Sequence, residues 1–319
     1  MGSEIEQGSI YKQLQGRHVL SLYDLTPAEL VYLVDAADDM KTQHKAGKAN
    51  RPLEGKTLGM LFEKPSTRTR LSFEIGIFQL GGMGMFLNTN DLHLGRGESV
   101  ADTANVLSGY LNGIMLRTYD HEMIESFATH AHIPVINGLS DRHHPCQVLA
   151  DLQTIREVKS GWNGVKLAYI GDGNNMAYSL LAGAAMTGMT ISMASPEGYK
   201  PDSDAIQQAS AVADKTGGHV EMTSDPQHAV KQADVIYTDV WKSMGQEKSN
   251  DREHAFAGYQ VNRELINAAR NDASFMHCLP ANRGKEVTDD VMDGSQSVIF
   301  QQAENRLHAQ KALMTALMG

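Results

Sequence analysis

Hydroxyl and guanidinium side chains are concentrated in one short run of the chain, Ser66-Thr67-Arg68-Thr69-Arg70. An apolar stretch over 57–62 precedes this run, and apolar residues at helical spacing over 73–80 follow it. The run therefore lies at a strand-to-helix turn, where unpaired N–H groups and the positive end of the helix dipole meet. An oxyanion, above all a phosphate, requires such a site. The alternative is an ordinary helix start with Ser66 as N-cap, but arginine alternating with threonine favours the anion site.

Polar side chains that could act on a bound group follow later apolar runs. Arg117 closes the run 113–116, where it either joins an anion site or marks the point at which a strand meets solvent. His144 and Gln147 are three residues apart and would share one face of a helix that begins there. Histidine can donate to a carbonyl oxygen and glutamine can hold a neutral amide, although both could simply belong to a helix cap.

The turn Gly171-Asp172-Gly173-Asn174-Asn175 follows another apolar run and begins like a dinucleotide-binding motif. Its third glycine is missing because Met176 stands there, which argues against a dehydrogenase that uses a nicotinamide cofactor. Asn174 and Asn175 at a helix N-terminus instead suit a carboxylate or another polar ligand.

Three further candidates lie at the ends of predicted elements. Asp239, followed by Ser243-Met244-Gly245, could hold a cationic amine or could cap a helix. Cys278 could be a nucleophile, a hydrogen-bonding group or an inert buried residue, and the last is the commonest state of cysteine. Arg306 opens the last helical segment and is expected in solvent unless that helix packs back onto the site.

Apolar runs that alternate with helical patterns predict an α/β fold with parallel, doubly wound sheets. Two such series predict two domains linked by helices, one of which covers 145–159. The cleft between the domains, near the carboxyl ends of the strands, is the expected active site. The predicted strands are 57–62, 83–87, 113–117, 133–136, 165–170, 190–194, 219–222, 235–238, 274–278 and 297–300, and the last helix is 303–318.

Composition limits the function classes. The 319 residues suffice for about two domains, and no stretch is apolar for long enough to cross a membrane. The net charge of −10 argues against a nucleic-acid partner, and it means that an anionic substrate needs a local cationic pocket. Two distant cysteines, no signal-peptide pattern and no zinc-like spacing predict a cytoplasmic protein without a metal.

Together and in this order, the motifs resemble those of the aspartate/ornithine carbamoyltransferase superfamily. The similarity runs from about Arg17 to Ala312. The run 62–70 marks the superfamily, whereas Asp239 with Ser243-Met244-Gly245 resembles its ornithine branch. Further matching motifs are 94–98, 144–147, 171–175, 277–280 and 304–306. His143 departs from the family pattern, because another residue is more typical at that position.

The resemblance implies transfer of the carbamoyl group of carbamoyl phosphate to the side-chain amine of L-ornithine, giving L-citrulline and phosphate without a cofactor. It implies that residues 1–148, completed by the C-terminal helix 303–319, bind carbamoyl phosphate and that 149–302 bind ornithine. It also implies a homotrimer or an assembly of trimers. Putrescine or an acylated ornithine is the nearest alternative acceptor, and a catalytically silent binding homologue is a more distant alternative.

The resemblance also implies roles for single residues, in which Arg117 and His144 contact the carbonyl oxygen and Gln147 holds the carbamoyl amide. The residues implied to bind carbamoyl phosphate are Ser66, Thr67, Arg68, Thr69, Arg117, His144, Gln147, Cys278, Leu279 and Arg306. Those implied to bind ornithine are Asn175, Asp239, Ser243, Met244, Cys278 and Leu279. Those implied to be catalytic are Arg117, His144, Cys278 and Arg306, with Cys278 orienting the amine and forming no covalent bond. The Leu279-Pro280 bond is implied to be cis.

Overall fold

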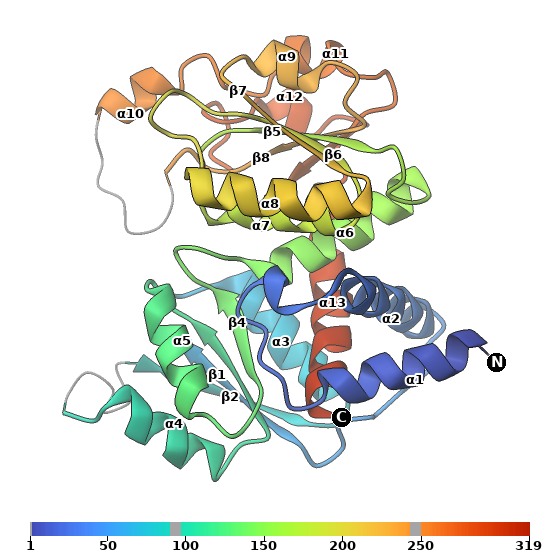
Figure 1. The fold of residues 1–319 in the computed structure, drawn as a ribbon, viewed down its shortest axis with the longest axis vertical. Coiled ribbons are helices and arrows are strands. Elements are labelled where there is room, and N and C mark those ends of the chain that lie inside the picture. Colours follow the sequence, from blue (N-terminus) through green and yellow to red (C-terminus); the bar gives the residue numbers. More distant parts are fainter. Residues whose placement is uncertain (1, 90–96, 243–249) are drawn as a thin grey trace. The chain divides into compact units, whose positions relative to one another are not determined.

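The structure, a computed structural model, describes residues 2–89, 97–242 and 250–319 (Figure 1). The chain forms two compact units, Met1–Gln153 with Glu304–Gly319, and Thr154–Ala303. Two helices cross the boundary between the units, α6 (Pro145–Lys159) and α13 (Ile299–Met318). Each unit contains one parallel sheet with helices between successive strands, which confirms the predicted α/β fold.

The first unit is built on a four-stranded sheet in the order β2-β1-β3-β4. Its strands are β1 (Thr57–Phe62), β2 (Met83–Asn88), β3 (Gly113–Arg117) and β4 (Val135–Leu139). Parallel strands need crossover connections, and α3 (Thr67–Gln79), α4 (Val100–Ser108) and α5 (His121–His130) supply them. Phe62 pairs with Arg117, so the segments that follow β1 and β3 leave the sheet side by side.

The first unit also contains α1 (Gly2–Leu14), the short 3₁₀ helix η1 (Leu22–Asp24) and α2 (Pro27–Lys45). At the beginning of α2, Thr26 accepts from the Glu29 N–H at 3.2 Å and Pro27 is the first helical residue, which is a typical helix start. Buried apolar side chains from β1, α3 and β3, among them Leu58, Phe73 and Ile114, contribute to the core.

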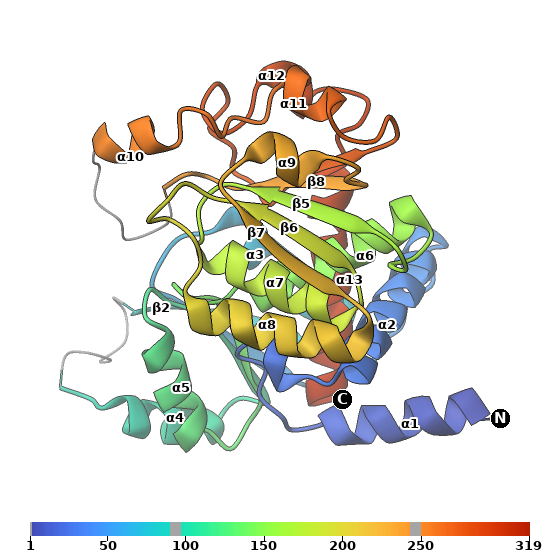
Figure 2. The same ribbon diagram turned by 45° about the horizontal axis from the view of Figure 1, so that its top comes forward.

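The second unit is built on a five-stranded sheet in the order β7-β6-β5-β8-β9. Its strands are β5 (Lys166–Ile170), β6 (Thr190–Ala194), β7 (His219–Thr223), β8 (Val235–Thr238) and β9 (Ser274–His277). Its helices are α7 (Asn175–Met186), α8 (Ser203–Thr216), α9 (Pro226–Val230), α10 (Asn250–Ala255), α11 (Arg263–Asn267) and α12 (Asp289–Met292). Helices α7 and α8 cover one face of the sheet, and α9 lies on the other (Figure 2).

The strand order of this sheet reverses at β5, which lies between β6 and β8. Ligands of doubly wound sheets bind where the order reverses, outside the carboxyl ends of the strands. Ile170 pairs with Thr238, and Thr238 pairs with His277. The turn 171–175, Asp239 and Cys278 therefore leave neighbouring strands at the same edge.

The predicted strand 297–300 is wrong. Ile299 is instead the first residue of α13, and Ser297 forms only a single bridge to Phe275. A short apolar run such as 298–300 is too brief to distinguish a strand from a helical turn, which is why the prediction failed. Among the helices of the described residues, none combines the length and the apolar character needed to cross a membrane.

Candidate active site

Three elements of the first unit converge on the hydroxyl group of Thr69, in the first turn of α3. Arg117 Nη1, from the end of β3, lies 3.3 Å from Thr69 Oγ1, and Arg306 Nη2, from α13, lies 3.4 Å from it. Ser66 precedes the helix and accepts from the Thr69 N–H at 3.3 Å, so it is an N-cap residue as well as a candidate anion ligand. The turn is thus both capped and lined by cationic groups.

Arg306 is only 2% exposed, so α13 packs back into the first unit. Its Nη1 donates to Gln147 Oε1 at 2.6 Å, and Gln147 Nε2 donates to Asp151 Oδ1 at 2.8 Å. In the amide orientation that satisfies both ends of Gln310, the Gln310 oxygen accepts from Arg306 Nη2 at 2.7 Å. The guanidinium group is therefore held from several sides while facing Thr69.

His144 lies among the same groups at the beginning of α6, where its carbonyl accepts from the Gln147 N–H at 3.1 Å. The side chain is buried, and burial lowers the pKa of His144 well below 6.5; the positive charges of Arg306, Arg117 and Arg68 lower it further. We call Arg68, Arg117 and Arg306 the arginine cluster. Burial and the arginine cluster together keep the imidazole of His144 neutral, so one ring nitrogen carries a proton and can donate a hydrogen bond.

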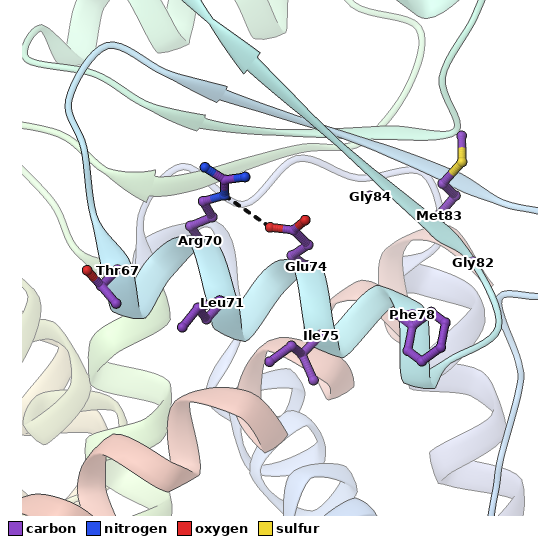
Figure 3. Close-up of a pocket in the computed structure, with 9 residues that line it drawn as sticks. All are labelled: Thr67, Arg70, Leu71, Glu74, Ile75, Phe78, Gly82, Met83 and Gly84. Carbon is purple, nitrogen blue, oxygen red and sulfur yellow. Dashed lines mark hydrogen bonds and ion pairs between the residues drawn. The ribbon is translucent and has the colours of Figure 1, made fainter.

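The two arginines of the 66–70 run have different surroundings. Arg68 is half-buried and its charge acts on His144, whereas Arg70 is exposed. Arg70 Nε donates to Glu74 at 3.1 Å (Figure 3). The Arg70 guanidinium also lies 4.1 Å from the centre of the Phe86 ring. Local partners therefore hold Arg70 on a different surface from Arg68.

A clamp that the sequence did not reveal joins the segments after β1 and β3. The Glu63 N–H donates to the Arg117 carbonyl at 2.9 Å, and the Tyr119 N–H donates to Glu63 Oε2 at 2.8 Å. Lys64 Nζ lies 3.6 Å from the centre of the Tyr119 ring. These contacts fix Arg117 relative to the 66–69 turn. These contacts depend on the pairing of β1 with β3, and the periodicity of the sequence does not predict which strands pair.

In the second unit, Asp239 accepts hydrogen bonds from two other strand ends. Asn174 Nδ2 donates to Asp239 Oδ2 at 2.9 Å, and Cys278 Sγ donates to Asp239 Oδ1 at 3.0 Å. We call Asn174, Asp239 and Cys278 the Asp239 cluster. Asn175, predicted as a ligand, is the first residue of α7 and is buried. It directly follows Asn174 of this cluster in the sequence. Ser243 and Met244 lie outside the described residues.

The glycine-rich turn of the second unit has a structural reason other than dinucleotide binding. A Cβ atom at Gly173 would lie 2.3 Å from the Pro201 nitrogen, so only glycine fits there. Asn174 then caps α7, with its Oδ1 accepting from the Met176 and Ala177 N–H groups at 2.9 and 3.2 Å. The close backbone approach thus positions Asn174 for its contact with Asp239.

Arg252 of α10 is a further residue near the site that the sequence did not predict. Its guanidinium forms an ion pair with Asp172, and its Nε donates to the Trp241 carbonyl. It also lies 4.8 Å from the centre of the Tyr199 ring and 5.5 Å from that of Phe256. Arg252 therefore ties α10 and the segment after β8 to the 171–175 turn.

A metal-like donor set accompanies the Asp239 cluster. Asp239, His277 and Cys278 place one ligand atom each within 4.8 Å of one another. However, His277 Nδ1 accepts from the Leu279 N–H at 2.9 Å, and its Nε2 lies 3.3 Å from Glu286 Oε1. Both ring nitrogens thus have protein partners. The Leu279-Pro280 bond is cis, as the resemblance implied, and Leu279 has a φ of 59°.

Comparison with known proteins identifies the family. The carbamoyl-P binding domain of aspartate/ornithine carbamoyltransferase matches residues 17–157, and the Asp/Orn binding domain of the same family matches residues 163–317. The chain belongs to the aspartate/ornithine carbamoyltransferase family.

Relatives within this family are similar over nearly their whole length. The ornithine carbamoyltransferase of Oceanobacillus iheyensis is 61% identical over 97% of this chain and 96% of its own. That of Thermococcus kodakarensis is 56% identical over 96% and 98% of the two chains. The solved structure of the Pyrococcus furiosus ornithine carbamoyltransferase is 53% identical, with a TM-score of 0.94 over 96% of this chain and 98% of that one. A member of this family thus needs sites for two substrates, and each unit provides one polar cluster.

Proposed function

We infer that this chain transfers the carbamoyl group of carbamoyl phosphate to the side-chain amine of L-ornithine, giving L-citrulline and phosphate. The observation that carries the inference is the 61% identity to an ornithine carbamoyltransferase across 97% of the chain. The arginine cluster adds a chemical reason, since an acidic chain with a net charge of −10 concentrates three guanidinium groups around one neutral histidine.

We propose that residues 1–148 with the helix 303–319 bind carbamoyl phosphate. The phosphate would accept from the hydroxyl and N–H groups of Ser66, Thr67 and Thr69 and from Arg68. Arg306 already faces Thr69 in the structure, which supports its place at the same anion. Charge-assisted hydrogen bonds of this kind are short and strong, and together they would fix the phosphate oxygens.

The carbonyl end of carbamoyl phosphate would lie between Arg117 and His144. A neutral His144 donates one hydrogen bond, and Arg117 supplies the charge that stabilises the oxyanion as it forms. Gln147 would hold the amide of the carbamoyl group. One lone pair of its Oε1 accepts from Arg306, so the second remains to accept from the carbamoyl NH₂.

We propose that residues 149–302 bind ornithine through the edge of the sheet that carries the Asp239 cluster. Asp239 and Asn175, with Ser243 and Met244, would bind the amino-acid end. Cys278 and the Leu279 carbonyl would orient the side-chain amine and lie close to carbamoyl phosphate. The Cys278 thiol donates to Asp239, which supports a positioning role for it and not a nucleophilic one.

In the reaction, the neutral amine of ornithine attacks the carbamoyl carbon and a C–N bond forms. The tetrahedral oxyanion then collapses, the C–O bond to phosphate breaks, and the amine loses its proton. A side-chain amine has a pKa of about 10, so the reactive neutral form becomes more abundant as pH rises. Holding the two substrates in line contributes about 7–11 kcal/mol of the barrier reduction, and no covalent intermediate with the protein is required.

The test is to mix the protein with carbamoyl phosphate and ornithine and to measure citrulline and phosphate together. We expect equal amounts of both products. Phosphate release without citrulline would contradict transfer to ornithine. Carbamoylation of putrescine or of an acylated ornithine at a higher rate than ornithine would move the proposal to that acceptor.

We also propose that the chain works as a homotrimer or an assembly of trimers. Exposed apolar side chains support self-association: α3 and the edge strand β2 expose Leu71, Ile75, Phe78, Met83, Met85 and Phe86. Several of these side chains line a hollow of about 720 Å³ (Figure 3). Exposed apolar surface of this kind marks interaction sites. The cytoplasmic location expected from the sequence stays a prediction.

A further inference from the structure

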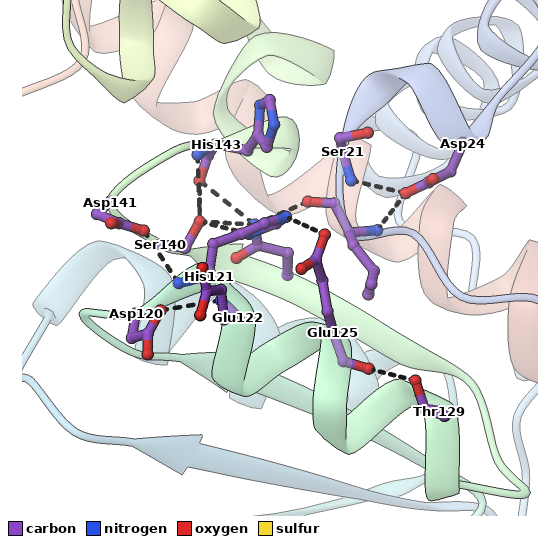
Figure 4. Close-up of polar contacts among 12 residues, drawn as sticks. Ser21, Asp24, Asp120, His121, Glu122, Glu125, Thr129, Ser140, Asp141 and His143 are labelled. Carbon is purple, nitrogen blue, oxygen red and sulfur yellow. Dashed lines mark hydrogen bonds and ion pairs between the residues drawn. The ribbon is translucent and has the colours of Figure 1, made fainter.

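Polar side chains of the first unit surround Ser140, which follows β4 (Figure 4). His121, the first residue of α5, places its Nδ1 2.9 Å from Ser140 Oγ, and its backbone N–H donates to Asp141 Oδ1 at 3.0 Å. The His143 ring packs edge-on against the His121 ring with the centroids 5.0 Å apart. The proposed substrate contacts include none of these residues, yet His144 follows directly in the chain.

Ser140 is the centre of the turn that leads to His144. The Ser140 N–H donates to the His143 carbonyl at 3.0 Å, and the His143 N–H donates back to Ser140 Oγ at 3.1 Å. Asn137 Nδ2, from β4, also donates to Ser140 Oγ at 3.3 Å. His144 then begins the next helix. The position of the Ser140 hydroxyl therefore determines where the backbone enters His144.

The hydrogen bonds of Ser140 assign the tautomer of His121. Two N–H groups donate to Ser140 Oγ and use both lone pairs of the oxygen. Its hydroxyl proton must then point to an acceptor, and His121 Nδ1 at 2.9 Å is closer than the His143 carbonyl at 3.4 Å. His121 Nδ1 therefore carries no proton, and Nε2, which lies 3.7 Å from Glu125 Oε1, carries the single ring proton.

We propose that His121 is a positioning residue for carbamoyl transfer: by accepting the Ser140 hydroxyl, it fixes the turn that places His144. The inference rests on the proposed role of His144 at the carbonyl oxygen. A displacement of about 1 Å in a catalytic group can cost about 10²-fold in rate, so a residue without substrate contact can still control the reaction.

The same contact responds to acid. A proton on His121 Nδ1 would aim a third N–H donor at the Ser140 oxygen, whose two lone pairs already accept from Asn137 and His143, so the turn would lose this support. Burial lowers the pKa of His121 and lowers that of His143 to about 4, so both rings are neutral at pH 7. The charged and titratable groups that act on the His121 ring are Glu125 of α5, Asp141, Arg142 and His143 of the turn, and Asp24 of η1.

A matched pair of substitutions tests the proposal. In His121→Asn the side-chain oxygen takes the place of Nδ1, whereas in His121→Gln it moves to the place of Nε2. We expect H121N to keep kcat within about threefold of the unsubstituted protein and H121Q to lose about 10- to 100-fold in kcat, with the KM for ornithine unchanged in both. His130→Gln, an exposed position on the same helix, is the control and should leave kcat unchanged.

The pH profile and a second variant complete the test. Because Asn does not titrate, H121N should keep a larger share of its pH 7.5 activity at pH 5.5 than the unsubstituted protein does. Ser140→Ala should lower kcat as much as H121Q does. The double variant H121Q/S140A should lower kcat no more than either single substitution. Equal activity of H121N and H121Q, full activity of S140A, or additive losses would each overturn the proposal.

His144→Ala distinguishes a failure of the proposed positioning role of His121 from a failure of the proposed carbamoyl transfer. If H144A keeps full activity, the proposed role of His144 fails. If H144A loses activity while H121Q and S140A keep theirs, the function stands and only the positioning role of His121 is wrong. If H121Q does not fold, S140A against H121N decides the same question, with loss in the first and retention in the second supporting the proposal.

Discussion

Arg68 and Arg70 lie two residues apart in the first turn of α3, yet they meet different surroundings. Arg68 contributes to the positive field at His144, whereas Arg70 pairs with Glu74 on the exposed side of the helix. An exposed ion pair such as that of Arg70 contributes little to stability, generally below about 1 kcal/mol. The two side chains therefore offer a matched comparison within one motif.

Replacing these arginines by alanine should have unequal effects. Arg68→Ala should raise the KM for carbamoyl phosphate by about 10- to 100-fold, because each hydrogen bond to a charged group is worth about 1.5–3 kcal/mol. Arg70→Ala should change this KM by less than about threefold. Steady-state kinetics at saturating ornithine measure both values. Equal effects of the two substitutions would refute the separation of Arg68 from Arg70.

How far the sequence predicts a site residue depends on how local its partners are. The spacing of Ser66 and Thr69 predicts a capped turn because both partners lie within one helical turn. His144 and Gln147 are likewise brought together by helical spacing. The burial of Arg306 depends on contacts with Thr69 and Gln147, which are 237 and 159 residues away. The sequence therefore could not decide whether Arg306 is in solvent or at the site.

At the scale of elements, strand pairing places each cluster. The register of the sheet brings the ends of β5, β8 and β9 to one edge. The residues that follow these strands, namely the turn 171–175, Asp239 and Cys278, therefore lie at that edge. The alternation of strands and helices predicted this edge. The ion pair of Arg252 with Asp172 could not be predicted in the same way, because 80 residues separate the partners.

The Arg252 ion pair leads to a prediction for the second unit. Arg252→Gln leaves the buried Asp172 carboxylate without its charged partner and should destabilise the protein by about 3 kcal/mol. Because Asp172 lies in the same turn as Asn174 of the Asp239 cluster, the KM for ornithine should rise while that for carbamoyl phosphate stays constant. Urea unfolding and two-substrate kinetics measure these effects. The double variant R252Q/D172N should recover part of the stability, and a double variant no more stable than R252Q would contradict a charge-based role.

The apolar face of α3 and β2 leads to a prediction about assembly. Phe78 is 76% exposed within this face, and Tyr110, outside it, is 77% exposed. Phe78→Asp should therefore shift the protein from a trimer to a monomer, because the face would have to bury a charge on association. Tyr110→Asp is the control of equal exposure and should keep the assembly. Light scattering after size-exclusion chromatography measures the mass, and a monomeric mass for the unsubstituted protein would refute the proposed trimer.

At the scale of the whole molecule, the net charge and the local charge at the proposed phosphate site have opposite signs. A net charge of −10 repels anionic substrates, and the arginine cluster reverses this field locally. The same unit keeps His121, His143 and His144 neutral, since burial lowers the pKa of each. Composition predicted the need for a cationic pocket, but burial of histidines depends on packing that composition does not contain.

These histidines make stability depend on pH. A histidine whose pKa is lower in the folded state takes up a proton on unfolding, so stability is lost as pH falls below the unfolded value of 6.5. His143, with a folded pKa of about 4, should alone account for a loss of up to about 3 kcal/mol between pH 6.5 and 4. Urea unfolding midpoints from pH 7 to 5 measure the slope. His143→Gln should flatten it and exposed His130→Gln should not, and equal slopes would count against the burial of a neutral His143.

Citrulline formation from carbamoyl phosphate and ornithine between pH 6 and 9, with putrescine as the parallel acceptor, tests the proposed function most directly. We expect turnover with ornithine to rise toward alkaline pH, because His144 already has a pKa well below 6.5 and only the amine still has to lose its proton. We expect little turnover with putrescine, which lacks the α-carboxylate of ornithine. A flat pH profile, or faster turnover with putrescine than with ornithine, would contradict the proposed transfer to ornithine by a neutral amine.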